Sequence, residues 1–201
     1  MFQYRDQTYT EVQFGSQDLK YGELIGCTFH RCSFAHGSLE EIMSVNCRFI
    51  ECDFRGAMLN GSIHKESAFE NCKFEGANLF VAKFEVCKMT GSDFTDANLD
   101  GITLIQGDWS YTNLRYARLS KQNLRGIKFQ EADFYGANLE KADMRDCDLS
   151  MTVLAKAKLF ETDVRGAAMD GVDFKSLTVA GLRMDRDQAV LMAISHGAKI
   201  K

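Results

Sequence analysis

The sequence predicts an all-β solenoid in which the chain turns a corner every five residues and closes a coil every twenty. The first observation is a large apolar residue at every fifth position from Tyr4 to Met184, interrupted only by Ser44 and His64. The second is a mostly small residue, Cys, Ala or Ser, two places before the apolar one from Cys27 onward. A period of five fits neither a helix nor a simple strand, so it indicates a regularly turning chain.

The third observation is a repeat of residue type at every twentieth position. One column is Leu19, Leu39, Leu59, Leu79, Leu99, Leu119, Leu139 and Leu159, and a second is Phe14, Phe34, Phe54, Phe74 and Phe94. A third runs from Phe29 through Phe49 and Phe69. Like residues recur because each coil stacks on the one before it, as in other solenoids. About nine coils of 20 residues therefore fit the repeat region.

The corners of the coil are marked by glycine. Eleven of the 16 glycines fall two residues after the central apolar position, where the lack of a Cβ eases a tight turn. One side is less regular: Ser44 and His64 take central positions there, and Ile42, Ile102 and Gln122 replace the small residue. We expect local distortion near 40–45, 61–66 and 102–106.

The seven cysteines, at 27, 32, 47, 52, 72, 87 and 147, all occupy the small inward position. No C-x-x-C spacing occurs, so we interpret them as small buried apolar residues. The four histidines lie at different phases of the repeat, and only His64 occupies a position that is expected to face inward. We interpret His64 either as a polar plug in the interior or as a residue that a bulge swings outward. A filled interior leaves no cleft for catalysis, so we expect neither an enzyme nor a metal or other cofactor.

Composition adds few constraints on the partner. The net charge is −4, no apolar run approaches the length of a membrane span, and the N-terminus lacks the features of a signal peptide. A cytoplasmic protein without membrane contact is the expectation. The sequence also contains no proline, which suits a backbone whose N–H groups donate to neighbouring strands.

The A-(D/N)-L-x-x pattern, seen in Ala77-Asn78-Leu79, Ala97-Asn98-Leu99 and Ala137-Asn138-Leu139, resembles that of the pentapeptide repeat proteins. The resemblance covers about residues 4 to 184. It implies a right-handed quadrilateral parallel β-helix, which the periods alone do not specify. We therefore divide the chain into a repeat domain, 1–184, and a capping or dimerisation helix with its tail, 185–201.

The segment after Met184 predicts a helix. An Asp supplies the N-cap, Val190, Leu191 and Ile194 form an apolar stripe, and Gly197 is suited to end the helix. The stretch D-x-D-Q-A-V…A…H-G resembles the C-terminus of the fluoroquinolone-resistance proteins of the Qnr and MfpA type. The resemblance implies a homodimer through Val190, Leu191 and Ile194, a surface that mimics DNA, and binding to DNA gyrase or topoisomerase IV. Because both periods persist without an insertion, the loopless branch is the closer match.

Charge is unevenly distributed along the chain. Residues 131–173 carry 10 acids against 5 bases, and dimerisation would double this excess. An acidic strip of this kind suits a basic saddle that normally holds DNA phosphates. Candidate contacts are Asp96, Asp100, Asp108, Ile105, Tyr111, Tyr116, Asp143, Asp146, Asp148, Asp163 and Asp170. The alternative is a solvated surface with turn-forming Asp residues.

The predicted function is a topoisomerase-binding protein that protects its partner from quinolones or a natural poison, without binding nucleic acid itself. One alternative is a self-immunity factor for a gyrase-targeting toxin. The other is an interaction scaffold unrelated to topoisomerases, since the repeat alone specifies no partner.

Overall fold

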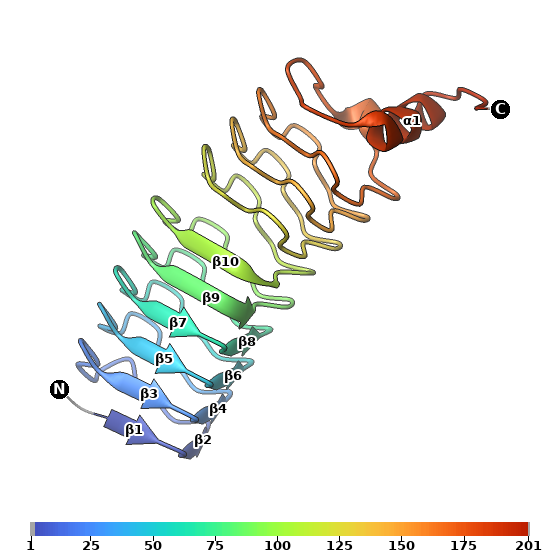
Figure 1. Ribbon diagram of the computed structural model, residues 1–201. Helices are drawn as coiled ribbons and strands as arrows, with labels where there is room; N and C mark the ends of the chain where they lie inside the picture. The colour runs from blue at the N-terminus through green and yellow to red at the C-terminus, as the bar shows by residue number, and fades with distance from the viewer. Residues whose placement is uncertain (1–2, 201) are drawn as a thin grey trace. The chain divides into compact units, whose positions relative to one another are not determined.

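A computed structural model describes residues 3–200, and the chain divides into two compact units, Met1–Asp108 and Trp109–Lys201. The fold is a right-handed quadrilateral parallel β-helix with one short C-terminal helix, as the sequence predicted. Figure 1 shows the ten labelled strands in the first unit and helix α1 (Arg186–Ser195) in the second. Of the described residues, none belongs to a helix long and apolar enough to cross a bilayer.

Strands of the first unit lie on two adjacent sides of the coil. One side holds β1 (Gln3–Arg5), β3 (Glu23–Ile25), β5 (Met43–Val45), β7 (Ile63–Lys65), β9 (Lys83–Lys88) and β10 (Thr103–Asp108). The other holds β2 (Thr8–Thr10), β4 (Thr28–His30), β6 (Arg48–Ile50) and β8 (Ala68–Glu70). Because β9 runs around the corner, it pairs with both β7 and β8 and joins the two sides into a single parallel sheet.

Strand pairing repeats at intervals of 20 residues. Tyr4 pairs with Leu24, Leu24 with Ser44, and Ser44 with His64. The remaining two sides are joined by isolated bridges in the same register, such as Ser33 with Asp53. The pairs described within each unit show no insertion in this register, in agreement with the loopless branch.

The interior of the first unit is built from the predicted apolar columns. Phe34, Phe54 and Phe74 are buried, and their rings stack with centroids 4.8 and 4.9 Å apart. A second column stacks Phe29 on Phe49 at 4.8 Å, close to the spacing of neighbouring strands in a sheet. The distance between coils is therefore also the stacking distance of the aromatic rings.

The corners share one backbone conformation. Among residues 3–200, positive φ angles of about 50–76° occur at the predicted corner phase in 11 glycines and in 23 other residues, Val81 and Val86 among them. Left-handed backbone favours glycine and strains β-branched residues most. The corner geometry is thus imposed by the coil and is adopted even where the residue does not favour it.

The second unit keeps the 20-residue register, but isolated bridges replace the strands. Asp143 pairs with Asp163, and Asp163 with Arg183, as isolated bridges. Among the described residues from 109 onward there is no strand, only the 3₁₀ turn η1 (Phe174–Ser176) and α1. About five turns of the β-helix are formed by strands, fewer than the nine coils predicted. The difference arises because the later coils are joined by single bridges instead of strands.

The described residues near 40–45 and 61–66, where distortion was predicted, keep the 20-residue register, whereas near 102–106 β10 runs unbroken through the corner and Gly107 just beyond has a φ of 114°. Residues 43–45, 63–65 and 103–105 keep the regular register with their neighbours. Ile42 and Ile102 are buried at the inward position, and small Ser44 lies next to the larger His64. The interior thus accommodates these substitutions by packing, without widening the turn.

Candidate interaction surface

A polar cluster lies in the interior of the first unit. His64 is buried; its Nδ1 lies 2.7 Å from Ser44 Oγ, and its Nε2 lies 3.0 Å from Ser62 Oγ. Its ring also stacks on Phe84. Burial lowers the pKa of His64 to about 3, so the ring is neutral at physiological pH. His64 therefore points inward as a polar plug, as predicted, and does not reach the outer surface.

All seven cysteines are buried, in agreement with the sequence interpretation. Burial raises the pKa of Cys47 and Cys87 to about 11, and that of Cys147 to about 12. These three side chains are therefore protonated thiols that pack as small apolar groups. Within residues 3–200, no group of three or more His, Cys, Asp or Glu side chains is arranged to hold a metal ion.

Four candidate contacts lie in the first unit. Asp96 is exposed at a corner with a φ of 55°, and Ile105 is exposed in β10. Asp100 and Asp108 are half-buried. Ile105 and Asp108 thus belong to the last strand of this unit and Asp100 precedes it closely in the sequence, whereas Asp96 lies at an earlier corner of the coil.

Two acids of the second unit are paired with arginines two residues later. Asp143 accepts hydrogen bonds from Arg145, and Asp163 from Arg165, with a shortest N–O distance of 2.6 Å in each pair. The adjacent guanidinium holds the pKa of each carboxyl below its usual value. Asp163 is itself buried. Both carboxylates are ionised, but their charge is locally compensated.

Among the other acids of this unit, Asp146 forms an ion pair with Arg125 at 2.7 Å. Asp148 is half-buried and accepts a hydrogen bond from the Ser150 backbone, and Asp170 is exposed. No described residue forms an ion pair with Asp148 or Asp170. These two aspartates are therefore the best-placed candidates for an attraction to a basic partner.

The exposed tyrosines have distinct surroundings. Tyr116 is 64% exposed, and its ring stands edge-on to Tyr135 at 5.7 Å. Arg115 lies over the Tyr135 ring at 4.3 Å, and the Lys156 ammonium lies 5.2 Å from the same ring. The sequence pattern did not predict this cationic and aromatic cluster, although the 20-residue register places 115 beside 135. Tyr111 is exposed at another corner.

Helix α1 is fixed to the preceding coil by two polar side chains. Asp185 caps the helix by accepting from the Asp187 and Gln188 N–H groups, and it also accepts from Gly166 N at 2.7 Å. Gln188 is buried and donates to the Val164 and Ala167 carbonyls at 2.7 and 2.9 Å. The role of Gln188 was not predicted, because the pattern gives no sign that this polar residue faces inward.

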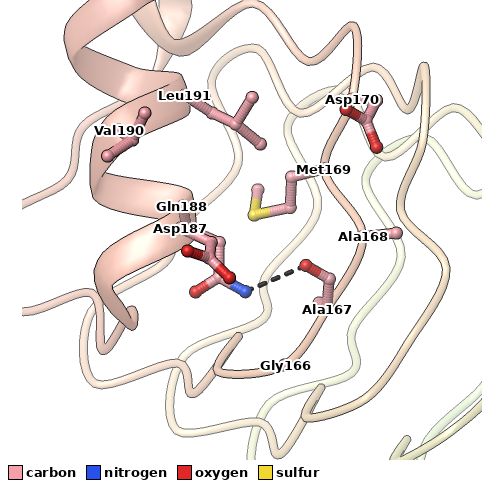
Figure 2. A pocket seen from close by; sticks show the side chains of 9 residues that line it. All are labelled: Gly166, Ala167, Ala168, Met169, Asp170, Asp187, Gln188, Val190 and Leu191. Carbon is pink, nitrogen blue, oxygen red and sulfur yellow. Dashed lines mark hydrogen bonds between the residues drawn. The ribbon is translucent and has the colours of Figure 1, made fainter. Parts of the chain in front are cut away.

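The apolar stripe of α1 is divided between two environments. Val190 and Leu191 are half-buried and line a groove of about 440 Å³ together with Met169 (Figure 2). Ile194 is 51% exposed and does not line this groove. Gly197 follows the helix with a φ of 92°, as the predicted helix end requires.

Comparison with known proteins gives two family models that match the sequence. One, described as pentapeptide repeats (8 copies), matches residues 47–85. The other, described as pentapeptide repeat region, matches residues 77–150. The two overlapping matches extend from 47 to 150, in both compact units. Among curated proteins, none matches this sequence.

Several solved structures have a similar fold. A trypsin-treated variant of QnrB1, described as a plasmid-mediated fluoroquinolone resistance protein, matches over 100% of both chains, with a TM-score of 0.77 and 20% identity. Full-length QnrB1 has a TM-score of 0.66 and 22% identity over 98% of this chain and 100% of its own. HetL from the cyanobacterium Nostoc sp. strain PCC 7120 has a TM-score of 0.53 and 21% identity, over 92% and 86%. Identities this low establish the fold alone.

Proposed function

The chain belongs to the pentapeptide repeat family, and we propose that it is a DNA-mimicking protein that binds DNA gyrase or topoisomerase IV in the cytoplasm. By competing for the site that holds DNA, it would protect the enzyme from quinolones or from a natural poison. The proposal is one of binding, not catalysis, and it includes no direct contact with nucleic acid.

The observation that carries the proposal is the division of the side chains into a filled interior and an outer surface that is rich in acids over residues 131–173, where 10 acids outnumber 5 bases. Neighbouring coils lie about 4.8 Å apart, and phosphates on one DNA strand are about 3.4 Å apart along the axis. Equivalent positions on successive coils are therefore spaced on a similar scale, as the bridged pair Asp143 and Asp163 illustrates. A basic surface shaped for phosphates would be attracted to the excess of acids on these coils.

Among the acids of this surface, we propose Asp148 and Asp170 as contacts in preference to Asp143 and Asp163. The charges of the latter two are compensated by neighbouring arginines, whereas the former two have no such partner among the described residues. Asp146, Tyr111 and Tyr116 add to the exposed surface of this unit. We further propose that two copies associate through α1, which would bring two such surfaces into one particle.

The experiment is a gyrase supercoiling assay in the presence of ciprofloxacin, with the protein titrated from substoichiometric amounts upward. Recovery of supercoiling, followed by inhibition only at high excess, supports protection through competition for the DNA site. Inhibition without recovery would support DNA mimicry but contradict protection from quinolones. That result would favour the alternative of self-immunity against another gyrase poison.

A second candidate, an interaction scaffold unrelated to topoisomerases, is favoured by the likeness to HetL, whose described role is the regulation of heterocyst differentiation. The same coil therefore occurs in proteins with different described roles. No effect on gyrase or topoisomerase IV in either direction would reject the first proposal and favour the scaffold.

A further inference from the structure

One side of the second unit is basic and carries exposed aromatic residues. It lies between the corners at Tyr116 and Lys121 and is repeated on the next two coils, over 136–141 and 156–161. Its cations are Arg118, Lys121, Lys141, Lys156 and Lys158, and its acids are Glu140 and Glu161. Because Glu161 forms an ion pair with Lys141 at 3.7 Å, the acids leave a net positive charge on this side.

The opposite side of the same coils carries the acids proposed above as gyrase contacts. Residues ten apart lie on opposite sides, because each of the four sides takes five residues. Lys158 is therefore opposite Asp148, and Phe160 is opposite Asp170. The second unit thus presents two surfaces of different charge, and a partner bound to one side need not cover the other.

A second groove, of about 310 Å³, lies on the basic side. Lys156 and Lys158 line it together with Leu159 and Phe160. Within residues 3–200, neither lysine forms an ion pair with an acid. Phe160 is 51% exposed and its ring lies on Gly181, where a Cβ added to the glycine would be 2.7 Å from a ring carbon. The groove therefore places two cations beside an apolar surface.

Aromatic contacts hold this surface in position. The Lys156 ammonium lies 5.2 Å from the Tyr135 ring, and Tyr116 stands edge-on to the same ring. The Tyr116 ring also lies on Gly136, where an added Cβ would be 2.6 Å from a ring carbon. Side chains that are ordered before binding lose less conformational entropy when a partner docks. Exposed tyrosine is also a residue type that contributes strongly to binding in protein interfaces.

A short acidic peptide segment fits this surface better than nucleic acid does. Three coils span about 10 Å from the first to the third, the length of about three residues of extended chain. Binding of nucleic acid usually rests on more phosphate contacts along a longer basic track. Glu140 also lines the groove, and its carboxylate would repel phosphates. The same carboxylate can accept a hydrogen bond from a peptide N–H group.

We propose that Lys156 and Lys158 bind the carboxylates of an acidic segment of a partner protein, with an apolar side chain of that segment in the groove against Phe160. Tyr116 extends the contact on the preceding coils. This inference goes beyond the proposed function, because it uses the side away from Asp148 and Asp170 and requires no topoisomerase.

Nuclear magnetic resonance of the full chain tests the inference with a defined probe, a peptide of about eight residues in which a Leu lies between pairs of Glu. We expect saturable shifts of the backbone amides of 156–160, with a dissociation constant below about 1 mM. Lys156→Gln with Lys158→Gln should raise this constant at least about fivefold. The matched control, Lys73→Gln with Lys128→Gln, removes the same charge from other exposed positions and should leave the constant nearly unchanged.

The absence of saturable shifts, or an equal loss of affinity in both double variants, would overturn the inference. A peptide with Gln in place of Glu should give no shifts, and equal binding of that peptide would contradict the role of the lysines. A thymidine oligonucleotide of similar length that binds the same amides more tightly would reject a protein partner in favour of nucleic acid. Asp148→Asn with Asp170→Asn should keep its affinity for the peptide while it loses affinity for gyrase, so each proposal can fail without the other.

Discussion

Ser44 Oγ and His64 Nδ1 lie 2.7 Å apart inside the first unit, where two consecutive coils stack. Both residues occupy positions that elsewhere hold large apolar side chains. Ser62 completes the cluster at His64 Nε2, and Ser67 lies 3.3 Å from Ser44. The two ring nitrogens of the buried imidazole are therefore both within hydrogen-bonding distance of hydroxyl groups, which is the usual condition for a buried polar group.

The cluster predicts a pH-dependent stability. The folded pKa of His64 is about 3, below the unfolded value near 6.5, so only the unfolded state gains a proton as the pH falls through this range. The contribution of His64 to the free energy of unfolding is therefore complete above about pH 6.5. It declines by up to about 1.4 kcal/mol per pH unit as the pH falls toward 3. Urea unfolding at pH 7 and pH 5 measures this slope. His64→Leu should remove it, and His36→Asn, at an exposed position, should retain it.

The strained corners predict opposite effects of glycine substitutions. Val86 has a φ of 54°, so Val86→Gly is expected to stabilise the protein by about 1 kcal/mol. Gly76 has a φ of 65°, and no heavy atom lies within 4 Å of the place that an added Cβ would take. Gly76→Ala should therefore destabilise by a similar amount through the backbone alone. Thermal unfolding of both variants provides the comparison. Equal shifts of the same sign would contradict the corner assignment.

The attachment of α1 depends on Gln188. Gln188→Met preserves the size of the side chain but removes its bonds to the Val164 and Ala167 carbonyls and to Asp185 N. Because buried groups lose their partners, the cost should be about 2–4 kcal/mol. We expect faster hydrogen exchange in α1, with little change in the strands of the first unit. Arg186→Gln, at an exposed position of the same helix, should leave the exchange rates unaltered.

The pairing of the acids predicts which charges matter for binding. Asp148→Asn with Asp170→Asn should weaken binding to gyrase by roughly tenfold, if each unpaired charge contributes about 0.7 kcal/mol. Surface plasmon resonance at low and moderate salt measures the effect, which salt should reduce. Asp18→Asn with Glu51→Gln makes the same charge change in the first unit and is the matched control. An equal loss of affinity for gyrase in both double variants would show that binding depends only on the net charge of the protein.

Much of the fold follows directly from the sequence because the five- and twenty-residue periods are properties of the coil itself. The Phe columns and the inward cysteines could be predicted for this reason. The left-handed corners at Val81 and Val86 could not, because these residues disfavour that conformation and only the closure of the coil imposes it.

The candidate surface was less predictable than the core. Whether Asp143 presents its charge to solvent depends on the orientation of Arg145, and the sequence pattern does not determine this orientation. The cluster of Arg115, Tyr135 and Lys156 requires knowledge of which residues neighbour one another across coils. Outward side chains lack the packing constraint that makes inward positions periodic.

The central claim is that this protein occupies the site on gyrase that otherwise holds DNA. The most direct measurement is fluorescence anisotropy of a labelled DNA duplex bound to gyrase while the unlabelled protein is titrated. Competition predicts a return to the anisotropy of free DNA, with an apparent affinity that weakens in proportion to the DNA concentration. Stable anisotropy at saturating protein, together with binding of the protein to the gyrase–DNA complex, would contradict the claim.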